Sequence, residues 1–183
     1  APLEAQTLWP CMEVGDVVGA AFLPTDGQAN PSDITRALAK SARTWGVQIF
    51  ENIEVTAIEI QNDRVIGVHT TEGHIRCEVV VNCCGQWARQ FGRLADVNVP
   101  LVSVQHQYLI TEPIKGITPD LPTLRDPDRL TYYKEEVGGL VMGGYERNPQ
   151  SWAGGGFPEN FQFTLLDSNW DHFEPMMELA LPR

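Results

Sequence analysis

The sequence predicts an α/β protein that combines a parallel sheet, interrupted by a β-meander, with a second, antiparallel sheet. Three observations support this prediction. A helical pattern over residues 31–45 runs into a short apolar strand, and three further short strands then alternate with turn residues. The run of valines at residues 79–81 leaves no polar face, which is typical of a strand buried inside a parallel sheet.

The helix of the first half has recognisable signals at both ends. Asn30 is a candidate N-cap residue, Pro31 suits the first helical position, and Gly46 follows the last residue of the pattern. We expect short strands on either side of this helix, at residues 17–23 and 47–50. The apolar residues of the helix recur at a spacing that places them on one face: Ile34, Ala37, Leu38, Ala42 and Trp45.

The β-meander leads into a candidate ligand-binding turn. Hairpin turns are predicted at residues 62–63 and 71–73, after which the chain enters the valine strand. The turn NCCG follows at residues 82–85, and a helix is expected over residues 87–95. Turns at the carboxyl end of a parallel strand commonly bind ligands, and small residues let the backbone approach a cofactor closely. A plain strand-to-helix connection is the alternative.

From residue 99 the pattern changes to antiparallel strands. Residues 99–114 predict one long alternating strand with His106 and Tyr108 on the same face, and two more strands meet in a turn near residues 137–139. A histidine, several tyrosines and a Gly-Gly strand on one sheet face would form a polar pocket wall, whereas the alternative is that they only fill the sheet. Lys134 and Arg147 are more simply explained as solvated edge charges.

The last part of the chain predicts a loop over residues 151–160 and a helix that begins near Asp171, where Glu174 has the spacing of a capping box. The glycine triplet at residues 154–156 lies in this loop. No G-x-G-x-x-G motif follows a strand anywhere in the sequence, so we expect the pyrophosphate of any bound nucleotide to be held outside this chain.

Composition excludes several classes of function. The formal net charge of −11 opposes binding to nucleic acid, and no apolar stretch approaches the roughly 20 residues that a membrane helix needs. Four cysteines are expected to be reduced thiols of an intracellular protein, and four histidines are scattered without metal-ligand spacing, so no metal site is predicted. The sequence starts without Met and stops within a helical pattern, which leads us to expect a portion of a longer protein.

Six stretches of the sequence together resemble one known family: LPTDGQANP, VVVNCCGQWAR, VPLVSVQHQYLITEPI, LRDPDRLTYYKEE, GGYERNP and WDHFEP. They are similar to the sarcosine and dimethylglycine dehydrogenases, FAD-dependent amine oxidoreductases of the D-amino-acid-oxidase-like group. The resemblance runs over nearly the whole chain, in the order of the family. One departure is Cys84, which stands where the family usually has Ala.

The resemblance implies roles for the residues of the turn. The flavin is expected to pass close to Cys83, Cys84 and Gly85, with Trp87 supporting the turn. The backbone of Val55 matches the position that contacts adenine in the group.

The resemblance also implies a substrate pocket on the antiparallel sheet. His106 and a tyrosine of TYYKEE match the family's substrate-pocket pair, and we expect this tyrosine to be Tyr132 rather than Tyr133, because alternation places Tyr132 on one face with Lys134. Further pocket residues are expected at Tyr108, Gly143, Gly144 and Tyr145.

These implications divide the chain into four parts. Residues 1–25 are expected to form a strand and turn of the substrate domain, and residues 26–96 a portion of the FAD-binding domain. Residues 97–150 would form the antiparallel sheet of the substrate domain, and residues 151–183 a loop and the start of a helix.

The implied function is oxidation of the N-methyl group of sarcosine or dimethylglycine by hydride transfer to FAD, with tetrahydrofolate as a further cofactor of a missing C-terminal region. An electron-acceptor protein or oxygen is the expected partner, and no nucleic-acid or membrane partner is expected. The location is the mitochondrial matrix in a eukaryote and the cytoplasm otherwise. The chain alone is expected to bind FAD poorly and to be inactive. The alternative is a non-catalytic relative, such as the regulatory subunit of pyruvate dehydrogenase phosphatase.

Overall fold

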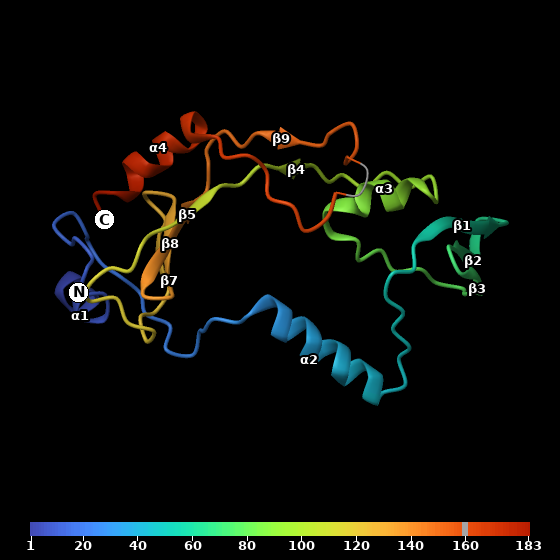
Figure 1. Ribbon diagram of the computed structural model, residues 1–183, viewed down its shortest axis with the longest axis horizontal. Helices are drawn as coiled ribbons and strands as arrows, with labels where there is room; N and C mark the ends of the chain where they lie inside the picture. The colour runs from blue at the N-terminus through green and yellow to red at the C-terminus, as the bar shows by residue number, and fades with distance from the viewer. Residues whose placement is uncertain (159–160) are drawn as a thin grey trace. The chain divides into compact units, whose positions relative to one another are not determined.

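The computed structural model describes residues 1–158 and 161–183, which form two compact units (Figure 1). The sheet unit consists of Ala1–Asn30, Gln105–Pro149 and Leu165–Arg183, and the meander unit of Pro31–Val104 and Gln150–Thr164. Helices and strands occur in both units, so the predicted α/β class is confirmed. No helix of the described part of the chain is both long enough and apolar enough to cross a bilayer.

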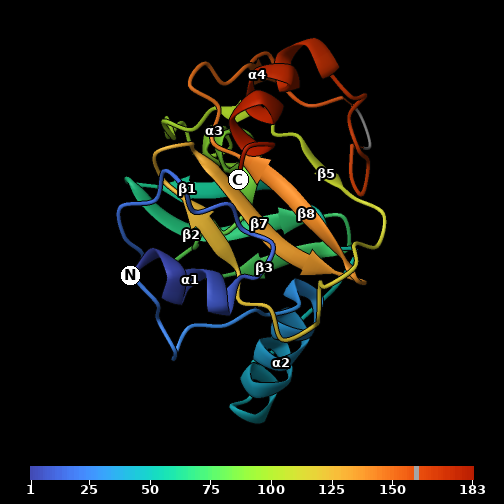
Figure 2. The ribbon, with the colours of Figure 1, turned by 90° about the vertical axis from the view of Figure 1, so that its left-hand side faces the viewer.

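A four-stranded antiparallel sheet forms the centre of the sheet unit (Figure 2). Its strands lie in the order β5 (Tyr108–Ile110), β8 (Gly139–Gly144), β7 (Thr131–Glu136) and β6 (Leu124–Asp126). The predicted turn between β7 and β8 is present, with positive φ angles at Val137 (50°) and Gly138 (82°). Two consecutive residues with positive φ give a tight hairpin whose twist matches that of the strands.

One face of this sheet packs into the core of the sheet unit. Helix α4 (Trp170–Ala180) contacts β7 and β8, and the end of helix α1 (Pro2–Leu8) is fixed by Trp9, whose indole donates to the carbonyl of Pro122 at 2.6 Å. Burial of apolar side chains is the main favourable term in such packing. The buried cluster consists of Trp9, Met12, Ile117, Leu121, Tyr133, Met142, Phe173, Met176 and Ala180.

The N-terminus of α4 differs from its prediction. The helix begins at Trp170, and the cap is Asn169, whose side-chain oxygen accepts from the backbone N–H of His172 at 3.1 Å. The capping box predicted around Asp171 and Glu174 is therefore wrong, because Asn169 already satisfies a free N–H of the first turn.

Ion pairs fix the C-terminal residue of the chain to the sheet unit. The guanidinium of Arg183 donates to Asp126 and to Asp16, each at 2.8 Å. Arg129 also pairs with Asp16, at 2.6 Å. The two arginines hold the pKa of the Asp16 carboxyl below its usual value, Arg129 having the larger effect.

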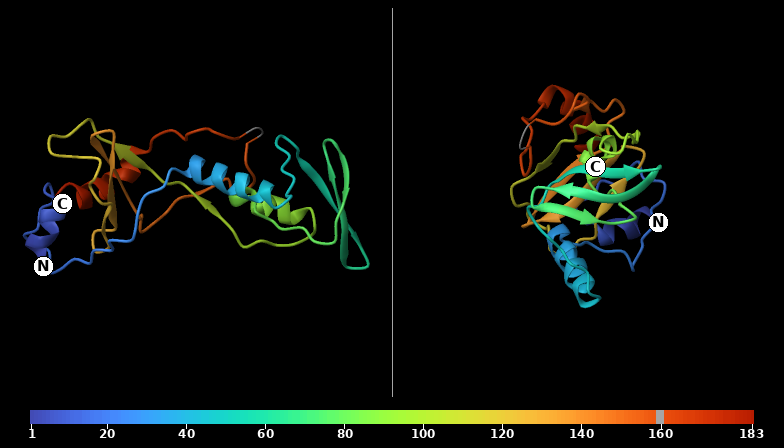
Figure 3. Two further views of the ribbon diagram at one scale, coloured as in Figure 1. Left: turned by 90° about the horizontal axis from the view of Figure 1, so that it is seen from below. Right: turned by 90° about the vertical axis from the view of Figure 1, so that its right-hand side faces the viewer.

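The meander unit contains the predicted helix and the predicted three-stranded meander (Figure 3). Helix α2 (Pro31–Thr44) ends before Gly46, whose φ of 83° closes it. Strands β1 (Val55–Gln61), β2 (Arg64–Thr70) and β3 (Gly73–Arg76) pair in chain order.

The remaining elements of the meander unit are short. The predicted helix after the NCCG turn is present as the 3₁₀ turn η1 (Gly85–Trp87) and helix α3 (Ala88–Arg93). Strand β4 (Ser103–Val104) pairs with β9 (Ser151–Trp152) in a two-stranded ladder.

Several predicted strands are not formed. Residues 17–23, 47–50 and 79–81 belong to no strand ladder, and Val79 and Val81 are 75% and 76% exposed. A strand needs a neighbour for its N–H and C=O groups, and every ladder in the described residues is antiparallel, so these residues offer residues 79–81 no parallel partner. The single strand predicted over residues 99–114 is divided into β4 and β5.

Candidate functional site

The second face of the four-stranded sheet carries a row of four residues in register. Tyr108 on β5 pairs with Gly143 on β8, Gly143 pairs with Tyr132 on β7, and Tyr132 pairs with Arg125 on β6. Residues directly opposite each other in adjacent strands point to the same side of a sheet. The row therefore crosses the whole sheet on the face opposite the core.

His106 lies next to this row. Its Nε2 atom is 3.2 Å from the hydroxyl oxygen of Tyr132, and the two rings are stacked with centroids 6.3 Å apart and planes inclined by 25°. The even-numbered residues from Val102 to Ile110 are exposed and the odd-numbered ones are half-buried, as alternation predicts. His106 and Tyr108 thus lie on one face, and the structure brings His106 and Tyr132 together.

The absence of a side chain at Gly143 gives the Tyr132 ring its position. A Cβ atom at Gly143 would lie 2.5 Å from the Tyr132 hydroxyl oxygen and 3.1 Å from the Cβ of Tyr108. Because real Cβ atoms do not approach other atoms so closely, only glycine allows the phenol to lie over β8.

Arg125 and Tyr145 complete this face. The guanidinium carbon of Arg125 is 4.6 Å from the centroid of the Tyr145 ring, a cation–π contact, and Tyr145 meets Tyr132 edge to face at 6.2 Å. Burial raises the pKa of the Tyr132 hydroxyl, and Tyr145 and Tyr108 raise it further. Tyr132 is therefore a neutral hydrogen-bond donor. We name His106, Tyr108, Arg125, Tyr132, Gly143 and Tyr145 the polar face.

Gly144, which was predicted as a pocket residue, and Tyr133, which was not, lie on the core side of the same strands. Gly144 points toward the side chain of Met176 on α4, and Tyr133 donates from its hydroxyl to the carbonyl of Ala180 at 2.8 Å. The preference for Tyr132 over Tyr133 therefore agrees with the alternation of β7. Lys134 pairs with Glu136 at 2.8 Å, which agrees with a solvated edge charge.

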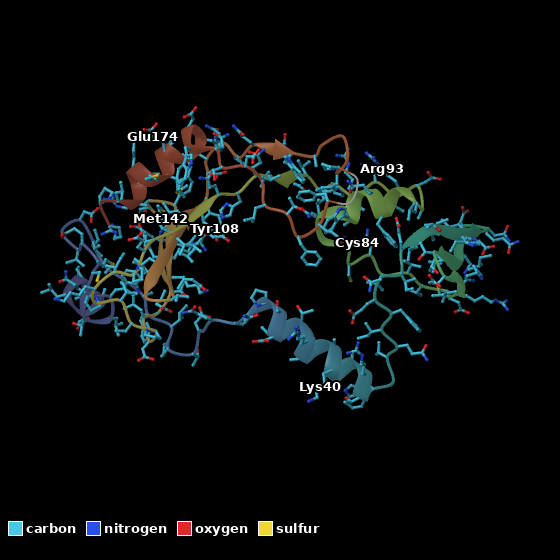
Figure 4. The ribbon with its side chains drawn as sticks, in the orientation of Figure 1. Lys40, Cys84, Arg93, Tyr108, Met142 and Glu174 are labelled. Atoms are coloured by element: carbon cyan, nitrogen blue, oxygen red, sulfur yellow. The ribbon has the colours of Figure 1, made fainter. Side chains whose placement is uncertain are left out.

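The NCCG turn of the meander unit is folded by its own asparagine. The side chain of Asn82 donates to the carbonyl of Ala88 at 2.9 Å and accepts from the backbone N–H of Cys84 at 3.2 Å. Figure 4 labels Cys84 in this turn, close to α3. Gly85 follows with a φ of 53°, and no atom lies within 4 Å of the place where a Cβ would stand. The turn is thus a fixed backbone with open space beside it, which suits close approach of a flat cofactor.

The other predicted cofactor residues lie in the turn, just after it and at the start of the meander. The indole of Trp87 packs against Phe157 with centroids 5.4 Å apart. Burial, with a smaller effect of Cys83, raises the pKa of the Cys84 thiol, which is therefore neutral and weakly nucleophilic. Val55 begins β1 and is paired with Thr70. All four cysteines are free of disulfides.

Sequence reasoning missed Arg125. It stands in a stretch that reads as a loop, two residues before a proline, and only the pairing of β6 with β7 places its side chain beside Tyr132. The single usable signal was its chemistry, because a carboxylate ligand calls for a guanidinium.

Comparison with known proteins matches this chain to a family of flavoproteins. The family profile described as FAD dependent oxidoreductase, or DAO, matches residues 2–181. Mitochondrial sarcosine dehydrogenase of Homo sapiens is 40% identical over 188 aligned residues, which cover 100% of this chain and 20% of the relative. The mitochondrial pyruvate dehydrogenase phosphatase regulatory subunit of Mus musculus is 35% identical, over 100% of this chain and 21% of that protein. The chain thus spans about a fifth of the length of these relatives.

A solved structure shares the fold. The crystal structure of L-proline dehydrogenase from P. horikoshii superposes with a TM-score of 0.77 at 25% sequence identity. The superposition covers 98% of this chain and 46% of that one.

Proposed function

The chain belongs to the family of FAD dependent oxidoreductases, and we propose that its polar face binds the substrate of a flavoprotein dehydrogenase that oxidises the N-methyl group of sarcosine or dimethylglycine. The observation that carries this proposal is the contact of His106 with Tyr132, 3.2 Å from nitrogen to oxygen, on a sheet face where Arg125 supplies a positive charge. The likeness to sarcosine dehydrogenase over the whole chain supports the substrate class.

The polar face offers one group for each part of such a substrate. N-methyl amino acids carry a carboxylate and, at neutral pH, a protonated amine. Arg125 and the neutral hydroxyl of Tyr132 are donors for the carboxylate. These contacts would orient the substrate, and orientation alone lowers a reaction barrier substantially.

The imidazole of His106 prepares the amine for oxidation. A C–H bond next to nitrogen gives up hydride only when the nitrogen lone pair is free to stabilise the developing cation. His106 is the group of the polar face that can accept the ammonium proton, and histidine is the usual general base near neutral pH. The Tyr132 hydroxyl, within 3.2 Å of Nε2, holds the ring in place.

The NCCG turn is the part of this chain that would contact the cofactor. FAD, when bound, supplies the acceptor for the hydride of the N-methyl carbon. Cys83, Cys84 and Gly85 would lie along it, with Trp87 supporting the turn and the backbone of Val55 near its adenine. The open space at Gly85 fits this role. We further propose that the full protein uses tetrahydrofolate and that an electron-acceptor protein or oxygen reoxidises its flavin. The mitochondrial relatives favour a location in the mitochondrial matrix.

The proposal is tested by anaerobic reduction of the flavin in the full gene product that contains this chain. Sarcosine or dimethylglycine should bleach the flavin absorbance, whereas glycine, which has no N-methyl group, should not. Failure of both substrates to bleach a flavin that dithionite does reduce would contradict the proposal. That result would favour a regulatory role, as in the pyruvate dehydrogenase phosphatase relative.

A further inference from the structure

The β-meander carries a cluster of metal-ligating side chains that the proposed oxidation does not use. Glu59 on β1, His69 on β2 and His74 on β3 point to the same side of the three strands, and one ligand atom from each lies within 4.8 Å of the others. From these three residues we infer a binding site for a divalent transition-metal ion of the Zn²⁺ type. This inference goes beyond the proposed oxidation and does not depend on it.

The geometry of the three ligand atoms is close to what such an ion requires. The Nε2 atoms of His74 and His69 lie 2.9 Å and 3.9 Å from the same carboxylate oxygen of Glu59. Around a tetrahedral zinc ion with bonds of about 2.0–2.1 Å, neighbouring ligand atoms are roughly 3.3 Å apart. The observed distances lie on either side of this value, so small side-chain rotations bring the three atoms onto one ion.

The backbone of the meander fixes the two imidazoles beside each other. His69 and His74 are directly paired across the short hairpin between β2 and β3, and their ring centroids are 4.9 Å apart. Gly67, two residues before His69, leaves room for His74, because a Cβ there would collide with its imidazole. The carboxylate of Glu59 then reaches the pair from the next strand.

The chemistry of the three donors selects the class of ion. Two imidazole nitrogens and one carboxylate are typical ligands of Zn²⁺, Co²⁺, Ni²⁺ or Cu²⁺, whereas Ca²⁺ and Mg²⁺ prefer oxygen ligands only. His69 and Glu59 are exposed on 53% and 41% of their side-chain surface, so the remaining coordination positions are open to water. The ion would join three strands and stabilise the meander unit.

Cobalt binding to the tag-free full gene product that contains this chain tests this inference. Co²⁺ should bind once per chain with visible d–d absorption bands of nitrogen and oxygen ligands, without the thiolate charge-transfer band that the cysteines would produce. Zn²⁺ should displace it. His69→Ala and His74→Ala should each weaken binding at least about tenfold, because even outer-shell partners of metal ligands cost 10–100-fold.

Matched variants separate metal binding from folding. Glu59→Gln should weaken binding, while Glu72→Gln, an exposed acid in a turn of the same meander, should bind as tightly as the wild-type chain. Added Zn²⁺ should raise the thermal midpoint of the wild-type chain and leave that of His74→Ala unchanged, although both share the same far-ultraviolet circular dichroism. Absence of cobalt bands, a thiolate band, or undiminished binding by His74→Ala would overturn the inference.

Discussion

Replacement by phenylalanine should affect the stability of the sheet unit differently at two adjacent tyrosines, because Tyr132 and Tyr133 point to opposite faces of β7. Tyr133 is 7% exposed, and its hydroxyl donates to the carbonyl of Ala180 in the core. Within the described residues, the Tyr132 hydroxyl has a single hydrogen-bond partner, the exposed His106. Tyr133→Phe should therefore destabilise the sheet unit, and Tyr132→Phe should not.

The hydrogen bonds of the two hydroxyls set the expected change in the free energy of unfolding. The carbonyl of Ala180 also accepts from the N–H of Arg183 at 3.0 Å, so Tyr133→Phe leaves no unpaired carbonyl and costs only the net value of one hydrogen bond, about 1 kcal/mol. Tyr132→Phe should change the free energy of unfolding by less than about 0.5 kcal/mol, as for a surface position. With a urea slope of about 2 kcal/mol per molar, Tyr133→Phe shifts the midpoint by roughly 0.5 M.

Urea unfolding measures this difference, with amide hydrogen exchange of β7 and β8 as the readout so that only the sheet unit is followed. The double variant should show the sum of the two effects, because the hydroxyls lie on opposite faces. If Tyr132→Phe lowers the midpoint as much as Tyr133→Phe, the assignment of faces is wrong and the Tyr132 hydroxyl does not belong to the polar face.

Three further predictions concern the sheet unit. Asn169→Ala removes the cap of α4 and should cost about 1 kcal/mol in urea unfolding, and an unchanged midpoint would mean that the cap contributes nothing. Gly144→Ala should lower the urea midpoint more than Gly143→Ala. At Gly144 the new methyl group meets the backbone carbonyl of Leu130 at 2.5 Å as well as Met176, whereas at Gly143 it meets the end of a tyrosine side chain, which can rotate away. Equal midpoints of the two variants would contradict this prediction. Burial raises the pKa of the Tyr133 hydroxyl above its ordinary value of 10.0, so the folded state holds this proton more tightly than the unfolded state. The stability that results is complete below pH 10 and is lost as the pH rises through the folded-state pKa. The urea midpoint should fall above pH 10 and fall less in Tyr133→Phe, and an equal fall in both would contradict the assignment.

Local signals predicted much of the fold. Asn62 and Asp63 were predicted as a hairpin turn, and both have positive φ, at 52° and 60°. Pro31 and Gly46 mark the two ends of α2 as expected. These features depend on a few consecutive residues, whose backbone preferences do not require distant partners.

Predictions that depend on distant partners were less successful. The valines at residues 79–81 have the composition of a buried strand, but a strand also needs neighbours, and the described residues provide none. The apolar face of α2 is likewise formed yet uncovered, with Leu38 68% exposed.

The polar face was only partly predictable. Alternation placed His106 and Tyr108 on one face, the resemblance to a family pointed to a tyrosine of TYYKEE, and alternation selected Tyr132. The register of β6 against β7, which brings Arg125 to the row, is a long-range property that no local pattern contains. The same is true of the proposed metal site, since Glu59 joins His69 and His74 only through the pairing of β1 with β2.

The role of His106 is tested most directly by the rate constant of flavin reduction in the full gene product, measured by stopped flow with saturating sarcosine. His106→Ala should lower this rate constant between roughly tenfold and ten-thousandfold, the range for loss of a general base, with the flavin content unchanged. Lys115→Ala, an exposed loop position, should reduce at the wild-type rate. A wild-type rate constant in His106→Ala would contradict the assignment of the polar face as the substrate site.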